Sequence, residues 1–192
     1  MDETSQRIID ATMSLVRDKG YVASTTKEIA KLAGVNECTI FRKFSSKKDI
    51  VLKGIEQEKW RGNFTSKVLE NITWDLQADL EMFMTEYMNH ITPDFVKLSI
   101  GLRAPQIYEE TEPLIMQIPQ IFISSLISYF EQMAMRGKIP YVDFKGLAMI
   151  IFSSTFGYTF LNASFSGKLT KMEKKYYIRE AVKIFISGIS KE

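Results

Sequence analysis

Cysteine and histidine each occur only once in this sequence of 192 residues, as Cys38 and His90. A single cysteine excludes a disulfide within the chain and suits a reducing cytoplasm. A zinc site built from histidine and cysteine needs several such residues close together, which this composition does not supply. A Ser-His-Asp triad would have to use His90, and no Gly-x-Ser-x-Gly turn is present to hold its serine. We therefore expect no metal, no cofactor and no catalytic residues, and we interpret the chain as a protein other than an enzyme.

A signal peptide and a clear membrane span are also missing from the sequence. Residues 1–5 lack the basic start and apolar core of a signal peptide. The stretch 147–167 carries no charge, but it holds too many small and polar residues for a membrane span. These residues are Ser153, Ser154, Thr155, Gly157, Thr159, Asn162 and Ser164. We expect a buried or interface helix there, in a cytoplasmic protein with no membrane partner.

No stretch alternates apolar and polar residues as a half-buried strand does, and nearly every segment has helical periodicity instead. Hydrophobic residues make up 45% of the chain, which is enough for a substantial core. In a first helix at about 4–19, Ile8, Ala11 and Leu15 share one face, and Gly20 follows where a glycine ends a helix. The sequence therefore predicts an all-α fold.

Two short helices, at about 26–33 and 37–44, follow the first. Thr25 and Glu28 have the spacing of a capping box at the start of one, and a glycine ends it. Asn36 is a suitable N-cap for the other. Two short capped helices joined by a tight glycine turn are typical of a helix-turn-helix unit, which binds DNA.

A fourth helix is expected to begin after Ser46 and to continue through Trp60 toward Phe64. Beyond it the chain is rich in Met, Phe, Ile and Tyr, and Pro119 should kink or end a helix. Further helices are expected at about 74–90, 94–103, 112–136, 143–165 and 172–188. We expect a helix-turn-helix DNA-binding domain at 1–46 and a helical effector-binding and dimerisation domain at 47–192.

Positive charge gathers beside the second helix of this unit. Residues 36–53 hold five basic side chains and two acidic ones, whereas residues 61–192 are balanced. Such a cluster would contact the phosphates of DNA, and DNA binding should weaken steeply as the salt concentration rises. A capped helical pair with surface lysines also occurs on proteins that do not bind DNA, so this pattern alone leaves that alternative open.

A recognition helix enters the major groove by its N-terminal end, so its first turns face the bases. Glu37 could accept from a cytosine amino group, and Cys38 and Phe41 could pack on thymine methyls. Thr39, Lys43 and Lys47 are better placed for phosphates, Thr25 and Thr26 offer donors at a helix N-terminus, and Lys27 could reach the groove rim. The candidate DNA-binding residues are Thr25, Thr26, Lys27, Asn36, Glu37, Cys38, Thr39, Phe41, Lys43 and Lys47.

The first fifty residues resemble the N-terminal domain of the TetR (tetracycline-repressor) family in order, spacing and residue type. The resemblance is carried by Ile9-Asp10-Ala11, Leu15, Gly20-Tyr21, Thr25-Thr26, Ile29-Ala30, Ala33-Gly34-Val35-Asn36, Thr39-Ile40-Phe41, Phe44-Ser45-Ser46-Lys47 and Ile50. It implies about nine helices, with three in the DNA-binding domain, and a homodimer that reads a palindromic operator in double-stranded DNA. It also implies that Thr26, Thr39, Phe41, Lys43 and Lys47 occupy phosphate-contacting positions, with Lys27, Glu37 and Cys38 near bases.

Three positions depart from the family pattern. Phe41 stands where tyrosine is usual, which removes a hydroxyl, and Lys43 stands where histidine or an aromatic residue is common. Cys38 stands where a small residue is usual. Cys38 could sense oxidants, but without a resolving cysteine we favour a structural or base-packing role.

Aromatic and methionine side chains beyond residue 60 could together line an adaptable apolar pocket, although for any one of them we favour a core position. Arg103 could meet a ligand carboxylate or phosphate, but we favour a surface pairing with Glu109 or Glu110. The candidate ligand-binding residues are Trp60, Phe64, Phe83, Tyr87, Phe95, Leu98, Arg103, Tyr108 and Phe122. The expected effector is a largely apolar small molecule.

The last two helices are expected to form the dimer interface. Small residues on the first of them permit close helix approach, and the second carries an apolar stripe at helical spacing. The candidate interface residues are Ser153, Gly157, Ser164, Ile178, Ala181, Val182 and Phe185. The sequence thus predicts a ligand-released repressor, with a regulator that is constitutive or protein-partnered as the alternative. Activation and repression are not distinguished by the sequence.

Overall fold

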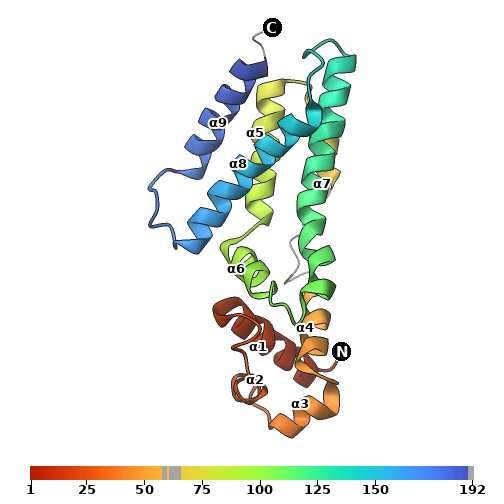
Figure 1. The fold of residues 1–192 in the computed structure, drawn as a ribbon, viewed down its shortest axis with the longest axis vertical. Coiled ribbons are helices and arrows are strands. Elements are labelled where there is room, and N and C mark those ends of the chain that lie inside the picture. The colour runs from red at the N-terminus through yellow and green to blue at the C-terminus, as the bar shows by residue number, and fades with distance from the viewer. Residues whose placement is uncertain (58–59, 61–65, 190–192) are drawn as a thin grey trace. The chain divides into compact units, whose positions relative to one another are not determined.

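The computed structural model describes residues 1–57, 60 and 66–189. The described residues contain nine α-helices, one 3-10 helix and no strand (Figure 1). The all-α prediction with about nine helices is therefore confirmed. The elements in chain order are α1 Glu3–Lys19, α2 Thr26–Ala33, α3 Glu37–Lys43, α4 Lys47–Ile55, η1 Ser66–Asn71, α5 Leu76–His90, α6 Pro93–Gly101, α7 Tyr108–Met135, α8 Phe144–Ser164 and α9 Lys174–Ile189.

The chain forms two compact units, each assembled from two separate segments. Unit 1 comprises residues 1–62 and 94–116, and unit 2 comprises residues 63–93 and 117–192. Unit 1 therefore contains α1 to α4, nearly all of α6 and the first part of α7. Unit 2 contains η1, α5, α8, α9 and the remainder of α7.

Local sequence signals determine where the short helices of unit 1 begin and end. The Thr25 hydroxyl accepts from the Glu28 amide while the Glu28 carboxylate accepts from the Thr25 amide, so the predicted capping box is present. Gly34 ends α2 in the left-handed conformation, with φ at 65°, which glycine adopts without steric cost. Ser46 caps α4 by accepting from the Asp49 amide. Asn36 precedes α3 as expected, but its side chain makes no cap hydrogen bond.

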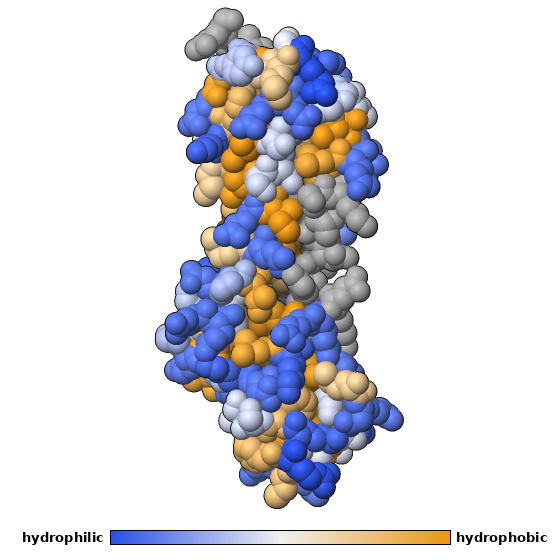
Figure 2. Space-filling model, turned by 90° about the vertical axis from the view of Figure 1, so that its right-hand side faces the viewer, coloured by the Kyte–Doolittle hydropathy of each residue, from blue (hydrophilic) through white to orange (hydrophobic). Residues whose placement is uncertain are grey.

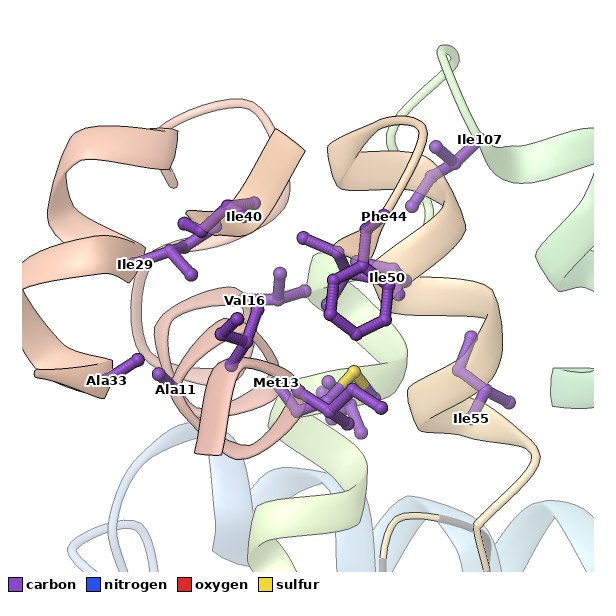
Figure 3. Close-up of a cluster of buried hydrophobic side chains, with 14 of the residues drawn as sticks. Ala11, Met13, Val16, Ile29, Ala33, Ile40, Phe44, Ile50, Ile55 and Ile107 are labelled. Atoms are coloured by element: carbon purple, nitrogen blue, oxygen red, sulfur yellow. The ribbon is translucent and has the colours of Figure 1, made fainter. Parts of the chain in front are cut away.

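The core of unit 1 is formed where these helices meet (Figure 3). Ile29 of α2 and Ile40 of α3 point toward one another, and Phe44 and Ile50 lie beside Val16 of α1. All five side chains are at most 4% exposed. The second segment of the unit adds three buried residues to the same cluster, Leu98, Leu102 and Ile107. This core holds α2 and α3 at a fixed orientation to α1.

One predicted feature of the helices was wrong. The fourth helix was expected to reach Trp60, but α4 ends at Ile55. The Gln57 amide donates to the carbonyl three residues earlier, and its side chain exchanges hydrogen bonds with Gln6 of α1. These tertiary bonds favour a turn over further helix. Pro119 was expected to kink a helix or end it, and α7 does not end there but runs as one helix to Met135.

Aromatic side chains form the centre of unit 2. Phe83 and Tyr87 of α5 contact Phe122 of α7, with ring centroids 6.4 and 4.7 Å apart. Phe152 of α8 joins both Tyr87 and Phe122. Burial raises the pKa of the Tyr87 hydroxyl. Figure 1 shows α8 crossing α5 obliquely in this unit, and α9 contacts both helices.

A buried carboxylate fastens the start of α5 to α7. Asp79, 1% exposed, accepts hydrogen bonds from the Thr73 amide and hydroxyl and from the Tyr129 hydroxyl, at 2.7 to 2.9 Å. Trp74, which follows Thr73 in the sequence, has a positive φ of 64°. Its ring lies under the Arg136 guanidinium at 3.6 Å, and its carbonyl accepts from Lys138.

Apolar residues also reach the surface of unit 2. The face seen in Figure 2 carries hydrophobic residues, drawn in orange, between hydrophilic ones. On α8 and α9 the exposed apolar residues include Ile150, Leu161 and Ile184, at 58, 41 and 72%. By length and composition alone, α7 and α8 are apolar enough to cross a membrane, which the core helices of many globular proteins also are.

Candidate nucleic-acid interface

The candidate interface is the surface of α3, whose orientation follows from one buried residue. Ile40 is 1% exposed and anchors α3 in the core. Successive residues of an α-helix lie about 100° apart around its axis, so Cys38 and Arg42 fall opposite Ile40. Both are exposed, and Phe41 beside them is 57% exposed although it is a large apolar residue. The helix therefore presents an outward face that the fold itself leaves uncovered.

Glu37, expected to accept from a cytosine, already has a partner within the chain. Its carboxylate accepts a hydrogen bond from the Thr26 hydroxyl at the start of α2. The bond joins two candidate DNA-binding residues that are eleven positions apart in the sequence. It places the Glu37 side of α3 against the N-terminus of α2, whose first-turn amides are donors.

Lys47, at the start of α4, lies across the connection between α1 and α2. Its ammonium donates to the carbonyls of Tyr21 and Ser24, both at 2.7 Å, and lies 4.1 Å from the centre of the Tyr21 ring. Burial lowers the pKa of this ammonium, with a smaller contribution from Lys19. The side chain therefore clamps the residues just before the helix-turn-helix motif, a role that the sequence did not reveal.

The other candidate DNA-binding residues lie around α3 and the start of α2. Lys43 pairs with Asp2 at 2.9 Å, and this hydrogen bond is the largest cause of an Asp2 pKa well below its usual range. Thr25 is held in the capping box, and Lys27 is exposed with no ion-pair partner among the described residues. Thr39 is half-buried and Asn36 is exposed.

Arg42 was absent from the residues selected by sequence. It is exposed on the outward face of α3, one turn after Cys38, and no acidic partner contacts it in the described part of the chain. Its position four residues after Cys38 is the signal that could have identified it, because residues at that spacing share one face of a helix.

The candidate ligand-binding residues fall into both units. Phe83, Tyr87 and Phe122 come together in the aromatic centre of unit 2. Leu98 is instead part of the core of unit 1, and Trp60 packs against that core. Phe95, Arg103 and Tyr108 also belong to unit 1, and Phe64 lies outside the described residues.

The expected surface pairing of Arg103 was wrong. Arg103 is exposed, but no ion pair joins it to Glu109 or Glu110 among the described residues. Glu110 pairs instead with Lys48 of α4, because the fold of unit 1 brings these two side chains together.

The candidate dimer residues differ in burial. Ser153 and Ser164 are exposed on α8, and Gly157 between them is half-buried. On α9, Ala181 and Phe185 are half-buried. Ile178 and Val182 are at most 4% exposed in a single chain, so both already pack inside their own unit.

Comparisons with known proteins agree with this arrangement. Residues 8–53 match the model of the family described as bacterial regulatory proteins, tetR family. A relative from Bacillus subtilis (strain 168), an uncharacterised HTH-type transcriptional regulator named YvkB, is 31% identical over 193 residues, which cover 99% of each protein.

Two solved structures have the same fold over nearly the whole chain. FadR from Bacillus subtilis, a transcriptional regulator solved in complex with stearoyl-CoA, has a TM-score of 0.67 and 22% identity, covering 96% of this chain and 98% of its own. The TetR family regulator PfmR from Thermus thermophilus has a TM-score of 0.70 and 15% identity, covering 96% of this chain and 100% of its own.

Proposed function

Because the chain belongs to the TetR family of transcriptional regulators, we propose that it is a repressor that binds a palindromic operator as a homodimer. A largely apolar small molecule releases it from the DNA. We assign DNA binding to residues 1–46 and effector binding and dimerisation to residues 47–192. This boundary separates the two proposed functions and does not coincide with the boundary of the compact units. Unit 1, which holds the DNA-binding motif, also includes residues 94–116.

One observation carries the proposal: the outward face of α3 is exposed while its opposite face is locked in the core. A helix entering the major groove needs this combination, since base edges must be approached by side chains of fixed position. Phe41 can pack on a thymine methyl. Thr26, Thr39 and Lys43 lie on the adjoining sides of the same motif and supply phosphate contacts.

Dimerisation is supported by α8 and α9. Their exposed apolar residues Ile150, Leu161 and Ile184 would be covered by a second copy. Ser153, Gly157 and Ser164 offer little bulk along α8, which permits close approach of another helix. Two recognition helices on the order of 34 Å apart, one turn of DNA, require a symmetric pair of chains.

The effector is assigned to unit 2, because the packed aromatic side chains of Phe83, Tyr87 and Phe122 give its interior the apolar character that such a ligand needs. The related FadR structure contains stearoyl-CoA, which makes fatty acids and acyl-CoA thioesters the first compounds to test. Such a ligand relieves repression only if it binds the conformation without DNA more tightly. The cytoplasm is the location that fits these partners.

The experiment begins by selecting duplexes from a random pool with the wild-type protein. We expect a palindromic consensus and dimeric complexes in gel shifts. Phe41→Ala should lose preference for the selected duplex over a scrambled one, whereas Ile100→Ala, an exposed apolar residue of α6, should not. Equal binding of both duplexes by the wild-type protein would contradict the proposal.

Fatty acids and acyl-CoA thioesters of increasing chain length are then added to the complex. Release of the duplex by one of them supports the inducer assignment. The second candidate, a regulator without a small-molecule inducer, is favoured if specific binding is intact and no compound releases it.

A further inference from the structure

Unit 1 has a basic groove on one side of α3, away from the candidate DNA contacts of α2 and α4. The groove is open, has a volume of about 640 Å³, and lies between the first turns of α1, the end of α2 and one side of α3. Its lining includes Arg7 of α1, Lys31 of α2, and Arg42 and Lys43 of α3. None of the described residues that line it is acidic.

The positive charge of this basic groove is not neutralised within the chain. Arg7, Lys31 and Arg42 are exposed, and none has an ion-pair partner in the described part of the protein. Lys43 alone is paired, with Asp2. Three uncompensated cations around one concave surface repel one another, so an anion bound there would be stabilised.

The end of α2 forms part of the groove wall, but its last carbonyls do not offset the positive charge of the groove. The carbonyl of Ala30 accepts from the Val35 amide, and that of Lys31 accepts from the Gly34 amide. Thr39 and Asn36, also in the lining, add neutral polar side chains that can donate to an anion.

The two sides of α3 face different surroundings. With Ile40 in the core, the spacing of about 100° per residue places Glu37 and Phe41 on one side of the helix and Thr39 and Lys43 on the other. The Glu37 side meets the N-terminus of α2 through Thr26. The Thr39 and Lys43 side forms one wall of the basic groove.

A helix with its side chains is about 10–12 Å across, and the major groove of DNA is about 12 Å wide. A recognition helix therefore fills the groove, and one sugar-phosphate strand runs along each of its sides. On the α2 side of α3, the first amides of α2 can donate to one strand. The opposite strand needs cations on the other side, which is where the basic groove lies.

We propose that the basic groove binds phosphodiester groups of the operator strand on the Thr39 side of α3, with Arg7 and Lys31 as phosphate contacts. This inference rests on the proposed function, since it requires α3 to enter DNA. Arg7 and Lys31 lie outside the recognition helix, so they contribute affinity for every sequence and no preference among bases. Arg42 also lines the groove and lies toward the outward face of α3.

The test measures how the dissociation constant of the full-length protein depends on NaCl, by fluorescence anisotropy with the selected duplex and with a scrambled duplex. The variants are Arg7→Gln, Lys31→Gln and both together. Each phosphate contact contributes about 0.9 to the slope of log K against log salt. We expect each single variant to reduce the slope by about 0.9 per protomer on both duplexes, and the double variant by about twice that.

Matched controls separate the charge from the fold. Arg7→Lys keeps the cation and should keep the slope. Lys97→Gln removes an exposed cation of α6 that does not line the groove and should leave the slope unchanged. Thermal melting by circular dichroism verifies that each variant is folded, and a variant that melts early is replaced by Arg7→Met or Lys31→Met.

Two results would overturn the proposal while the proposed function stands. One is wild-type selection of a palindrome with an unchanged slope in the double variant. The other is calorimetric binding of inorganic phosphate at constant ionic strength, lost in the double variant, with the duplex slope unchanged. A wild-type protein that binds no duplex specifically would instead refute the proposed function.

Discussion

Replacing Lys47 by methionine should destabilise the DNA-binding unit before any DNA is added. The change keeps an unbranched side chain and removes the ammonium that donates to the carbonyls of Tyr21 and Ser24. A hydrogen bond from a charged group contributes about 1.5–3 kcal/mol. Lys47 is only half-buried, and removing its charge also relieves a desolvation cost, so we expect a net loss of about 2 kcal/mol for the two bonds. For a chain of this size, that lowers Tm by about 4–8 °C.

The assay is urea unfolding followed by circular dichroism, with Lys48→Met as the control. Lys48 is the next residue along α4, and among the described residues its ion-pair partner is the exposed Glu110, so its replacement should have a small effect. Equal unfolding free energies for Lys47→Met and the wild type would refute the clamp described above.

The same variant reports separately on DNA. If the Lys47 ammonium also contacts a phosphate, the salt slope falls by about 0.9 per protomer. A loss of stability with an unchanged slope would assign Lys47 to the fold alone. A loss of stability together with a reduced slope would show that the ammonium both binds the carbonyls of Tyr21 and Ser24 and contacts a DNA phosphate.

Three further predictions concern stability. Tyr129→Phe removes a hydrogen-bond donor to the buried carboxylate of Asp79. Urea unfolding should show that the free energy of unfolding falls by about 1.5–3 kcal/mol. A fall of less than half of the lower value would contradict a stabilising role for this bond. Gly101→Ala places a Cβ against a carbonyl of α1 and should cost about 1–3 kcal/mol, whereas Gly188→Ala meets open space and should be tolerated. The pKa of Glu28 is lowered to about 2, chiefly by its hydrogen bond with Lys19, so its stabilisation is present above pH 4.5 and is lost as pH falls toward 2. The Tm difference between wild type and Glu28→Gln should shrink over that interval, and a constant difference would contradict it.

Local signals allowed much of unit 1 to be predicted. The capping box of Thr25 and Glu28 and the glycine at position 34 act within a few residues, so the bounds of α2 can be read from the sequence. The end of α4 could not be read in this way, because it depends on Gln57 bonding to Gln6, about fifty residues away.

In the candidate site, too, local features could be predicted from the sequence and features that depend on tertiary contacts could not. The exposure of Cys38 and Phe41 follows from the period of α3 once Ile40 is placed inside. The partners of Lys47 and Glu37, and the meeting of Arg7 with Lys31 in one groove, require three helices to be packed first. Sequence spacing contains no such information, which is why Arg7 and Lys31 were not selected.

The division of unit 1 into two segments affects how this protein is made. Its core includes Leu98, Leu102 and Ile107, which a ribosome adds only after all of α5 has been synthesised. The DNA-binding motif therefore leaves the ribosome early, but its core can close only after these later residues have been synthesised. An amino-terminal fragment ending near residue 62 would expose the apolar surface that those residues cover. DNA-binding measurements should therefore use the entire chain.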